Sequence, residues 1–472
     1  MKNYLGIDIG TTSLKAAVFD GEGRRQGLVH YEYELKTDAV TGFIECDPDL
    51  YVTLAENAIA ELRAACKKID AIAVDTQGET MILTDENGNP LCPAVVWLDN
   101  RAAEEADEVR RVFGSKEVYE VTGQPEITAG WPATKLLWFK AHRPEIFQKI
   151  RRVFLLEDWI NYRLTGQFVT EPTIQSSSVY FDIRARRYWE KMLDYIGLSA
   201  ECFPRVVNTA EPIGTTPDGI PVIAGALDQI AGTVGCGATS EGIISEMTGT
   251  IMAICAATDS IPDYDRNSII PCHLHALPGK YCRLLWSGTA GMALKWFKNN
   301  FAENFSFAEL DGIAEKVAPG CDGMTVLPHF TGSTMPKYDP DARASFSGVT
   351  LAHTRAHFAR AIMEAIAFQL REDLEYIGTE QVREIRITGG GASSPLWAQI
   401  KADVTGKVLR TVAESETACL GCAVFCAVGL GDRPSMEEAA RIMTHPAEEY
   451  RPGTADYTEA YARFTDTENK LL

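Results

Sequence analysis

The sequence predicts an α/β protein of two related domains that face each other. Three observations predict this. Segments with the two-residue period of strands alternate with segments of helical period through the first half of the chain. An opening pattern of apolar strand, Gly-Thr turn and second apolar strand returns in outline at 244–255. With 472 residues the chain is also too long for one typical core, so two large domains are expected.

Residues 4–19 predict a β-hairpin. Residues 4–9 alternate apolar with small or polar side chains, as a half-buried strand does, and residues 14–19 are apolar enough to lie deep in a sheet. The glycine of the turn lets the backbone approach a ligand closely, and its neighbours supply hydroxyl and amide donors. The turn consists of Gly10, Thr11, Thr12 and Ser13.

Two charged residues flank this turn. Lys15 supplies a positive charge just beyond it, and Asp8 ends the first strand where a hard cation would want an oxygen ligand. On these residues alone, two interpretations stay open. The hairpin holds the phosphates of a nucleotide, or it is an ordinary Gly-Thr hairpin with a polar tip.

The rest of the first half continues the alternation. An amphipathic helix is predicted at 48–67 and a buried strand at 69–75. A strand at 221–226 is followed by a helix that starts at Asp228. Short strands are predicted at 81–84 and 94–97 around an Asn87-Gly88 turn, and helices at 101–113, 132–142 and 157–164.

The second half restarts with the hairpin at 244–255. Strands follow at 282–286 and 384–388, and long helices at 357–376 and 395–405. We place the domain boundary near Ser240. The predicted division is 1–240, which carries the first hairpin, 241–434, which carries the second, and 435–472, a helical C-terminal appendage.

Composition narrows the partners and the compartment. The net charge of −20 and the pI of about 4.9 argue against nucleic acid and against an anionic membrane surface. The N-terminus enters a strand directly, without the pattern of a signal peptide, and no apolar run is long enough to span a bilayer. The 12 cysteines are scattered through apolar segments, as in proteins with reduced thiols. We therefore expect a cytoplasmic protein.

Two further segments could carry chemistry. Asp228 stands at the carboxyl end of a strand, where α/β sheets bind ligands, but an aspartate at a helix start is also a common N-cap. The stretch 387–395 reads as a strand, a triple-glycine loop and a helix start, which together allow backbone to approach a charged ligand. Neither segment is specific when taken alone.

Together these segments resemble the FGGY carbohydrate kinases, the family that includes xylulokinase, gluconokinase, fuculokinase and glycerol kinase, from the first residue to about Arg433. The resemblance implies two actin-like (ribonuclease H-like) α/β domains flanking a central catalytic cleft, with ATP and Mg²⁺ as cofactors. The domain 1–240 would bind the sugar and carry the phosphate hairpin, and the domain 241–434 would bind the nucleotide. It makes Asp228 the catalytic base, which would orient the attacking hydroxyl and take its proton. It also places Mg²⁺ between Asp8 and Asp228, with Asp8 reaching the ion directly or through water.

The resemblance also implies which residues bind ATP. They come from both hairpin turns, from a helix start in the second half and from the triple-glycine loop. They are Gly10, Thr11, Thr12, Ser13, Lys15, Gly249, Thr250, Gly291, Lys295, Gly390, Gly391 and Ser394.

The substrate segment departs from the family pattern. Glycerol kinases carry an Arg-Glu pair and xylulokinases a Met-His pair where this chain has Gly78 and Glu79, so it keeps a carboxylate and lacks the cation. Carboxylate oxygens accept hydrogen bonds from vicinal hydroxyls. Asp99 and Arg101 either contact sugar hydroxyls or pair with each other. The implied sugar-binding residues are Gln77, Gly78, Glu79, Asp99, Arg101, Trp131, Asp228 and Gln229.

Three motifs have metal-like spacing, but we expect them to be structural. Cys419, Cys422 and Cys426 lie in an apolar run of small residues, where cysteine replaces alanine in a packed helix. The pairs His353/His357 and His273/His275 lack the accompanying residues of a zinc site.

The expected function is ATP-dependent phosphorylation of a sugar hydroxyl, with a ketopentose such as xylulose as the first substrate. Kinases for another ketose or a polyol, of the fuculose, gluconate or glycerol type, are the alternatives. An actin-like or chaperone-like nucleotide-dependent interaction protein is the alternative from another class. A sugar-sensing regulator is a third possibility, but the sequence shows no DNA-binding module or basic patch that would support it. The expected partners are sugar and ATP, with a homodimer left open.

Overall fold

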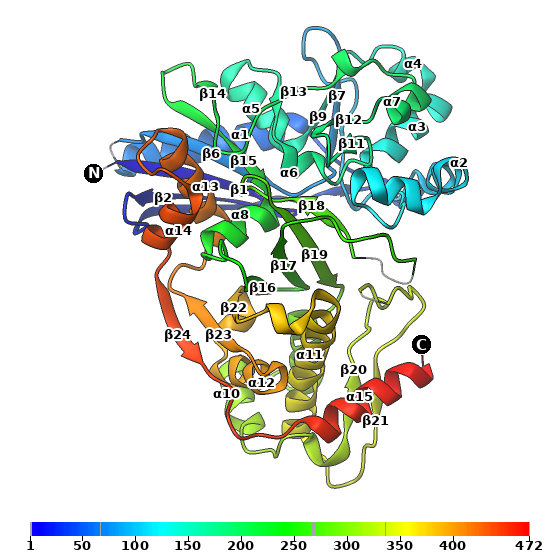
Figure 1. Cartoon of the computed structure of the whole chain (residues 1–472), viewed down its shortest axis with the longest axis vertical. Helices are drawn as coiled ribbons and strands as arrows, with labels where there is room; N and C mark the ends of the chain where they lie inside the picture. The colour runs from blue at the N-terminus through cyan, green and yellow to red at the C-terminus, as the bar shows by residue number, and fades with distance from the viewer. Residues whose placement is uncertain (1, 67, 267–269, 336, 472) are drawn as a thin grey trace.

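Each half of the chain is built around its own β-sheet, and the two sheets lie one above the other along the long axis of the molecule (Figure 1). The structure is a computed structural model that describes residues 2–66, 68–266, 270–335 and 337–471. Lys67, the predicted last residue of the first helix, lies outside the described residues.

The first sheet has six strands in the order β14-β15-β6-β1-β2-β3. Strands β1, β6 and β15 are parallel neighbours, and β2 returns antiparallel to β1 as the predicted hairpin. The bounds are β1 (Asn3–Ile9), β2 (Ser13–Asp20), β3 (Arg25–Glu32), β6 (Ala71–Thr76), β14 (Pro212–Thr215) and β15 (Pro221–Leu227).

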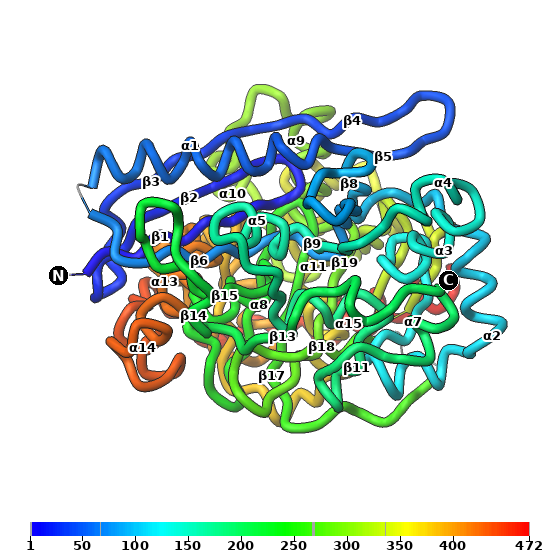
Figure 2. Tube along the Cα trace, turned by 90° about the horizontal axis from the view of Figure 1, so that it is seen from above, coloured from blue at the N-terminus to red at the C-terminus, as the bar shows by residue number. Residues whose placement is uncertain are grey.

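Helices and a smaller sheet surround the first sheet. Helix α1 (Pro48–Cys66) lies along β2 and β3 (Figure 2) and buries one face that includes Tyr51, Ala55 and Leu62. The smaller, five-stranded sheet consists of β4 (Lys36–Thr37), β5 (Ile44–Cys46), β7 (Met81–Thr84), β8 (Ala94–Val95) and β9 (Arg152–Leu155). The helices of this region are α2 (Ala103–Thr122), α3 (Pro132–His142), α4 (Pro144–Phe147), α5 (Leu156–Thr165), α6 (Pro172–Gln175) and α7 (Glu190–Ile196).

Helix α2 runs further than predicted. The helical pattern was expected to end at Phe113, and Gly114 does leave the helical conformation, with φ 76° and ψ 148°. The helix resumes beyond this kink because Val118 is buried in the same core as Phe113, and Tyr119 is buried in a neighbouring cluster with Phe181 and Cys272. Tertiary packing therefore carries the helix past a residue that interrupts it locally.

The second sheet repeats the plan of the first. Its order is β18-β19-β17-β16-β22-β23-β24, with β16 antiparallel to β17 and parallel to β22, and β22 parallel to β23. The bounds are β16 (Ile243–Thr248), β17 (Met252–Thr258), β18 (Cys272–Leu274), β19 (Tyr281–Ser287), β22 (Glu384–Thr388), β23 (Val408–Val412) and β24 (Pro446–Tyr450).

The predicted internal repeat is confirmed by this topology. Strands β3-β2-β1-β6-β15 of the first sheet correspond in order and direction to β19-β17-β16-β22-β23 of the second. The first helices of the second half are α9 (Gly291–Phe301), α10 (Phe307–Ala314), α11 (Arg355–Ile377) and α12 (Pro395–Thr405), with β20 (Thr325–Leu327) and β21 (Ser345–Ser347) as a separate pair.

Two helices between the sheets join the halves. Helix α8 (Asp228–Gly235) follows β15, and helix α13 (Thr417–Gly429) from the second half packs on α8 and on strands β1 and β6 (Figure 1). The approach requires glycine. A Cβ on Gly6 would lie 2.0 Å from the carbonyl oxygen of Cys419, and one on Gly421 would lie 2.0 Å from that of Ala231.

The proposed division near Ser240 lies in the loop between α8 and β16. The segment after Pro434 was expected to be a helical appendage, and this prediction is wrong at its centre. Strand β24 pairs with β23 and extends the second sheet. The helices on either side, α14 (Met436–Met443) and α15 (Thr458–Leu471), bury side chains in the cores of the two halves. The strand lies on the sheet edge and is mostly exposed, so its polar sequence carries little strand signal.

Candidate active site

Three carboxyl groups meet at the carboxyl ends of the parallel strands in the first sheet. Asp8 is the penultimate residue of β1 and lies opposite Asp75, the penultimate residue of β6. Asp75 lies opposite Ala226 on β15, and Asp228 follows the end of that strand as the first residue of α8. The sheet register therefore brings together residues that lie in three distant parts of the chain.

The electrostatics of this cluster follow from its burial. Burial raises the pKa of Asp228 well above its usual range, and the negative charge of Asp8 raises it further. Burial also raises the pKa of Asp8, against the lowering effects of the neighbouring Asp75 carboxyl and of the charge on Lys15. A carboxyl with a raised pKa is suited to take a proton near neutral pH. Its nearby acidic neighbours also favour a cation in the same place.

Asp75 was missed by the sequence analysis. It has no exposed surface, its Oδ2 accepts a hydrogen bond of 3.2 Å from the Sγ of Cys422, and its Oδ1 has no hydrogen-bond partner. Burial raises the pKa of Asp75, and the charges of Asp8 and Asp228 act in the same direction. Its place at the end of a predicted buried strand, like that of Asp8, was the signal available in the sequence.

The donor set fits Mg²⁺ bound together with phosphate. Among the described residues, no group of three or more His, Cys, Asp or Glu side chains is arranged to hold a metal ion. Mg²⁺ is commonly held by one or two carboxylates, with phosphate oxygens and water completing an octahedral shell. The partly exposed Asp8 and Asp228 can supply such carboxylates, and the unpartnered oxygen of buried Asp75 adds negative character beside them.

The first hairpin turn lies next to the carboxyl cluster. The amide of Gly10 donates to the carbonyl of Ser13 at 3.0 Å, which closes the turn, and Thr12 is exposed. The hydroxyl of Thr11 accepts a hydrogen bond of 3.0 Å from the indole nitrogen of Trp97, so this turn is tied to the predicted substrate segments.

Lys15 is engaged by the second half of the chain. Its Nζ donates to Glu416 Oε2 at 2.7 Å, and Glu416 precedes the first residue of α13. The hydrogen bond to Glu416 raises the pKa of Lys15 against the effect of burial. The ion pair places the lysine at the junction of the two halves, and part of its charge is already balanced.

The seven predicted nucleotide residues of the second half line one cavity of about 990 Å³. The second turn docks on the start of α9, where the amide of Gly291 donates to Gly249 O at 2.9 Å and that of Met292 to Thr250 O at 3.2 Å. A Cβ on Gly391 would lie 2.5 Å from Cγ2 of Thr248. Glycine in the triple-glycine loop therefore packs against the turn. The seven are Gly249, Thr250, Gly291, Lys295, Gly390, Gly391 and Ser394.

Helix α10 supplies a further wall that the sequence analysis missed. Phe307, Ala308 and Asp311 line the same cavity from this helix. Burial raises the pKa of Asp311, while a hydrogen bond with Ser394 lowers it. The available signal was the capping box of Ser306 and Glu309, which marks a helix start in the sequence.

The predicted substrate segment turns sharply after β6. The amide of Gln77 donates to Ile9 O at 3.0 Å, while both side-chain polar atoms of this residue, only 3% exposed, lack hydrogen-bond partners. Glu79 has a positive φ of 55°, which is strained for a residue with a Cβ. Buried amides without partners are rare, so Gln77 is a candidate for contact with a polar ligand.

Two other predicted substrate residues have defined contacts. Trp131 precedes α3, and its indole nitrogen donates to Glu126 O at 2.8 Å, which leaves its rings for packing or stacking. Gln229 follows Asp228 in α8, and its backbone amide donates to Asp228 Oδ1 at 2.7 Å. This bond fixes the orientation of the predicted base.

Asp99 and Arg101 pair with each other, which is one of the two alternatives left open by the sequence. Arg101 Nε donates to Asp99 Oδ1 at 2.8 Å, and Nη2 donates to Asp99 Oδ2 at 2.9 Å and to Glu45 Oε1 at 2.8 Å. The guanidinium also lies 4.0 Å from the ring centroid of Phe43. Since these polar atoms are already used, we omit the pair from the proposed sugar contacts.

The three metal-like motifs are mainly structural. Cys419, Cys422 and Cys426 are fully buried in α13, as expected, although Cys422 also reaches Asp75. The Nδ1 atoms of His353 and His357 accept hydrogen bonds from backbone amides of Thr350 and Thr354. His273 and His275 are buried, and desolvation lowers the pKa of each to about 4.

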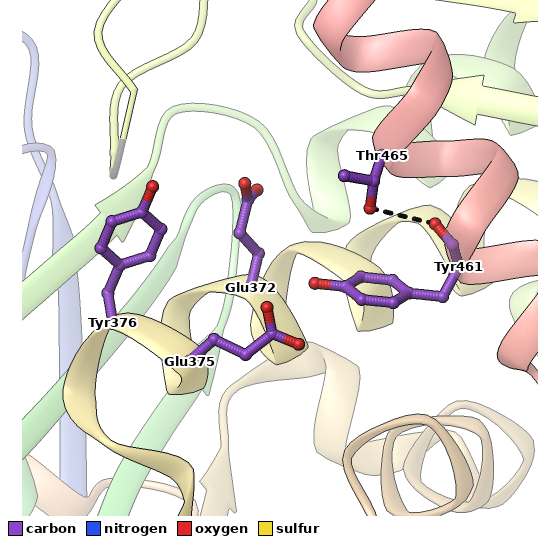
Figure 3. A pocket seen from close by; sticks show the side chains of 5 residues that line it. All are labelled: Glu372, Glu375, Tyr376, Tyr461 and Thr465. Carbon is purple, nitrogen blue, oxygen red and sulfur yellow. Dashed lines mark hydrogen bonds between the residues drawn. The ribbon is translucent and has the colours of Figure 1, made fainter.

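A second, smaller hollow of about 330 Å³ lies between α11 and α15 (Figure 3). Its lining consists of Glu372, Glu375, Tyr376, Tyr461 and Thr465, and contains none of the predicted site residues. We therefore place the candidate active site at the carboxyl cluster and the larger cavity. Within the described chain, no helix combines the length and the apolar character that a membrane span requires.

Comparisons with known proteins agree with this geometry. The N-terminal domain of the FGGY family of carbohydrate kinases matches residues 3–237, and its C-terminal domain matches residues 288–430. Over 462 residues the chain is 26% identical to the xylulose kinase of Lactococcus lactis, covering 94% of this chain and 91% of that protein. Over 457 residues it is 28% identical to the gluconokinase of Bacillus subtilis, covering 91% and 88%.

Solved structures give the same picture of the fold. The glycerol kinase of Plasmodium falciparum with ADP superposes with a TM-score of 0.91 at 24% identity, covering 100% of this chain and 98% of that one. The expected two-domain actin-like fold is confirmed.

Proposed function

The chain belongs to the FGGY family of carbohydrate kinases, ATP-dependent phosphotransferases, and from this premise we propose that it phosphorylates a hydroxyl of a neutral ketose, with xylulose as the first candidate. One observation supports the site assignment above all others. The sheet register brings Asp228 beside Asp8, next to the turn of the first hairpin.

In the proposed mechanism, Asp228 accepts the proton of the attacking sugar hydroxyl. Its raised pKa makes it a stronger base than an exposed aspartate, and the backbone amide of Gln229 holds its carboxylate in place. The turns at Thr11 and Thr250 supply amides and hydroxyls for phosphoryl oxygens. Asp8 would hold Mg²⁺ directly or through water, with Asp228 in the outer shell, and the ion would supply positive charge against the phosphates.

The proposed preference for a neutral sugar follows from the charges around the substrate segment. Lys135 is the cation that acts on Glu79, and Arg101 lies near that lysine. Arg101 is bound by Asp99 and Glu45, and Lys135 donates to a backbone carbonyl and faces Glu79. Neither cation is left over to pair with the carboxylate of a sugar acid. Relatives named xylulose kinase support the ketopentose, and the gluconokinase among the relatives supplies the sugar acid as the competing class.

The test is ADP release by the purified full-length protein with a panel of xylulose, ribulose, fuculose, gluconate and glycerol. We expect the highest kcat/KM with a ketose and little turnover of gluconate. The variant Asp228→Asn should lose turnover by about 10²–10⁴-fold while calorimetry still detects ATP binding. The control Asp466→Asn changes an exposed carboxylate of α15. Substantial turnover by Asp228→Asn would count against its role, and a clear preference for gluconate would contradict the neutral substrate.

A further inference from the structure

Lys135 is a lysine without exposed surface that lies between the two segments of the predicted sugar site. It belongs to the first turns of α3, and its Nζ donates to Val96 O at 2.8 Å and to Glu79 O at 3.5 Å. A buried ammonium group is costly unless its charge is balanced and its donors are used. The two carbonyls accept hydrogen bonds from two of the three N–H donors of Lys135. Its positive charge still needs a negatively charged neighbour, and the identity of that neighbour indicates the role of the lysine.

The charged groups that face Lys135 are Glu79, Asp99 and Arg101. Asp99 is neutralised by its bidentate pair with Arg101, and Arg101 also binds Glu45. By this balance, the carboxylate left to complement Lys135 is that of Glu79. Burial lowers the pKa of Lys135 to about 7, and Glu79 is the first of the charges that oppose this shift.

Glu79 needs support because its backbone is strained. Its φ of 55° lies in the left-handed region, which costs a residue with a Cβ about 1–3 kcal/mol. Ser177 hydrogen-bonds to its side chain, which lowers the pKa of Glu79 against the effect of burial, as does the charge of Lys135. Lys135 thus acts on both the backbone and the carboxylate of this residue.

The same lysine joins two chain segments. Val96 belongs to the segment after β8, and Glu79 to the segment after β6. Next to this contact, the amide of Trp97 donates to Thr80 Oγ1 at 3.3 Å, and the indole of Trp97 donates to Thr11 Oγ1 at 3.0 Å. A chain of contacts therefore runs from Lys135 through both substrate segments to the first hairpin turn.

We propose that Lys135 is a positioning residue of the sugar site, which holds the strained Glu79 in place and keeps its carboxylate ionised to accept hydrogen bonds from two sugar hydroxyls. The inference rests on the proposed sugar-kinase function and deepens it. Glycerol kinases carry an arginine where this chain has Gly78. In this chain, helix α3 supplies a cation to Glu79 instead, through Lys135.

The experiment compares Lys135→Met, Glu79→Gln and the double variant in full-length protein, with Lys140→Met as the control on the same helix. Lys140 is exposed, and its Nζ donates to Tyr195 O at 2.9 Å, away from the sugar segments. We expect Lys135→Met to raise the sugar KM about 10–100-fold and to change the ATP KM less than twofold. The double variant should be no worse than the poorer single variant, because both changes remove the same interaction.

If Lys135→Met does not fold, a second variant, Lys135→Arg, tests the same role through the pH dependence of the sugar KM. Wild-type sugar KM should rise as the pH increases through 7, because Lys135 then loses its charge while Glu79, Asp99 and Arg101 keep theirs. Lys135→Arg stays charged and should lack this rise. Unchanged sugar KM in Lys135→Met, additive effects in the double variant, or the same pH dependence in Lys135→Arg would overturn the role. If wild type phosphorylates no sugar, the proposed function itself fails, which is a different result from a working kinase that ignores Lys135.

Discussion

Substitution of Gly6 by alanine should push the two halves of the molecule apart. A Cβ at this position would lie 2.0 Å from Cys419 O, 2.7 Å from its carbonyl carbon and 2.8 Å from its Cα. All three are backbone atoms of α13, so no flexible side chain can move away. Helix α13 would have to shift by roughly 1.4 Å from β1 to restore ordinary contact distances of about 3.4 Å or more.

The expected loss in the free energy of unfolding follows from overpacking a close-packed interior. Overpacking costs about 1–3 kcal/mol, and the cost lies at the upper end of this range where the backbone must move. For a half of this size, about 3 kcal/mol corresponds to a fall in the melting temperature of roughly 6–12 °C. The same shift moves Cys422 away from Asp75 and Glu416 away from Lys15, so kcat should fall as well.

Differential scanning calorimetry and steady-state kinetics measure both effects. Gly21→Ala is the matched control, because a Cβ at Gly21 meets nothing within 4 Å and its backbone is not in the left-handed region. If Gly6→Ala melts within about 2 °C of Gly21→Ala, the close contact between β1 and α13 does not exist in solution, and the proposed junction is wrong.

Three other predictions concern single residues. Because the pKa of Asp75 is raised in the folded state, its carboxyl costs stability above its ordinary pKa, and this cost grows with pH up to the folded pKa. Asp75→Asn should therefore stabilise the protein against urea more at pH 8 than at pH 5, and an equal gain at both pH values would refute this. Gly312→Ala, in α10 where a Cβ meets nothing, should raise stability by about 0.5–1 kcal/mol in urea unfolding, and a loss would contradict the open space. Lys15→Met breaks the ion pair with Glu416 and should raise the ATP KM more than the sugar KM; equal changes in both would speak against a phosphate role.

The local pattern of the chain was enough to predict the two hairpins, their repeat and most helices. Apolar alternation in β1 and the Gly-Thr turns of both hairpins survive in the structure because they depend on neighbouring residues and on burial of one face. The predicted nucleotide residues of the second half came from the resemblance to the family. The structure adds a local reason for glycine at 291 and 391, because a Cβ there would lie 2.3 Å from Gly249 O and 2.5 Å from Thr248 Cγ2.

Strand β24 and the kinked helix α2 were not accessible from local pattern. The exposed edge strand exists because β23 offers it hydrogen-bonding groups, and the helix continues past Gly114 because a distant core buries its far end. In both cases the deciding partner lies elsewhere in the chain, beyond any window of the sequence.

By itself, the sequence determined that a glycine-threonine hairpin occurs twice and that Asp8 and Asp228 stand at the ends of two predicted strands, because these are properties of contiguous residues. Only the tertiary structure decided that Asp75 joins Asp8 and Asp228, that Arg101 is used by Asp99, and that Lys135 faces Glu79. Charge balance and sheet register depend on which distant residues become neighbours, and folding alone makes that choice.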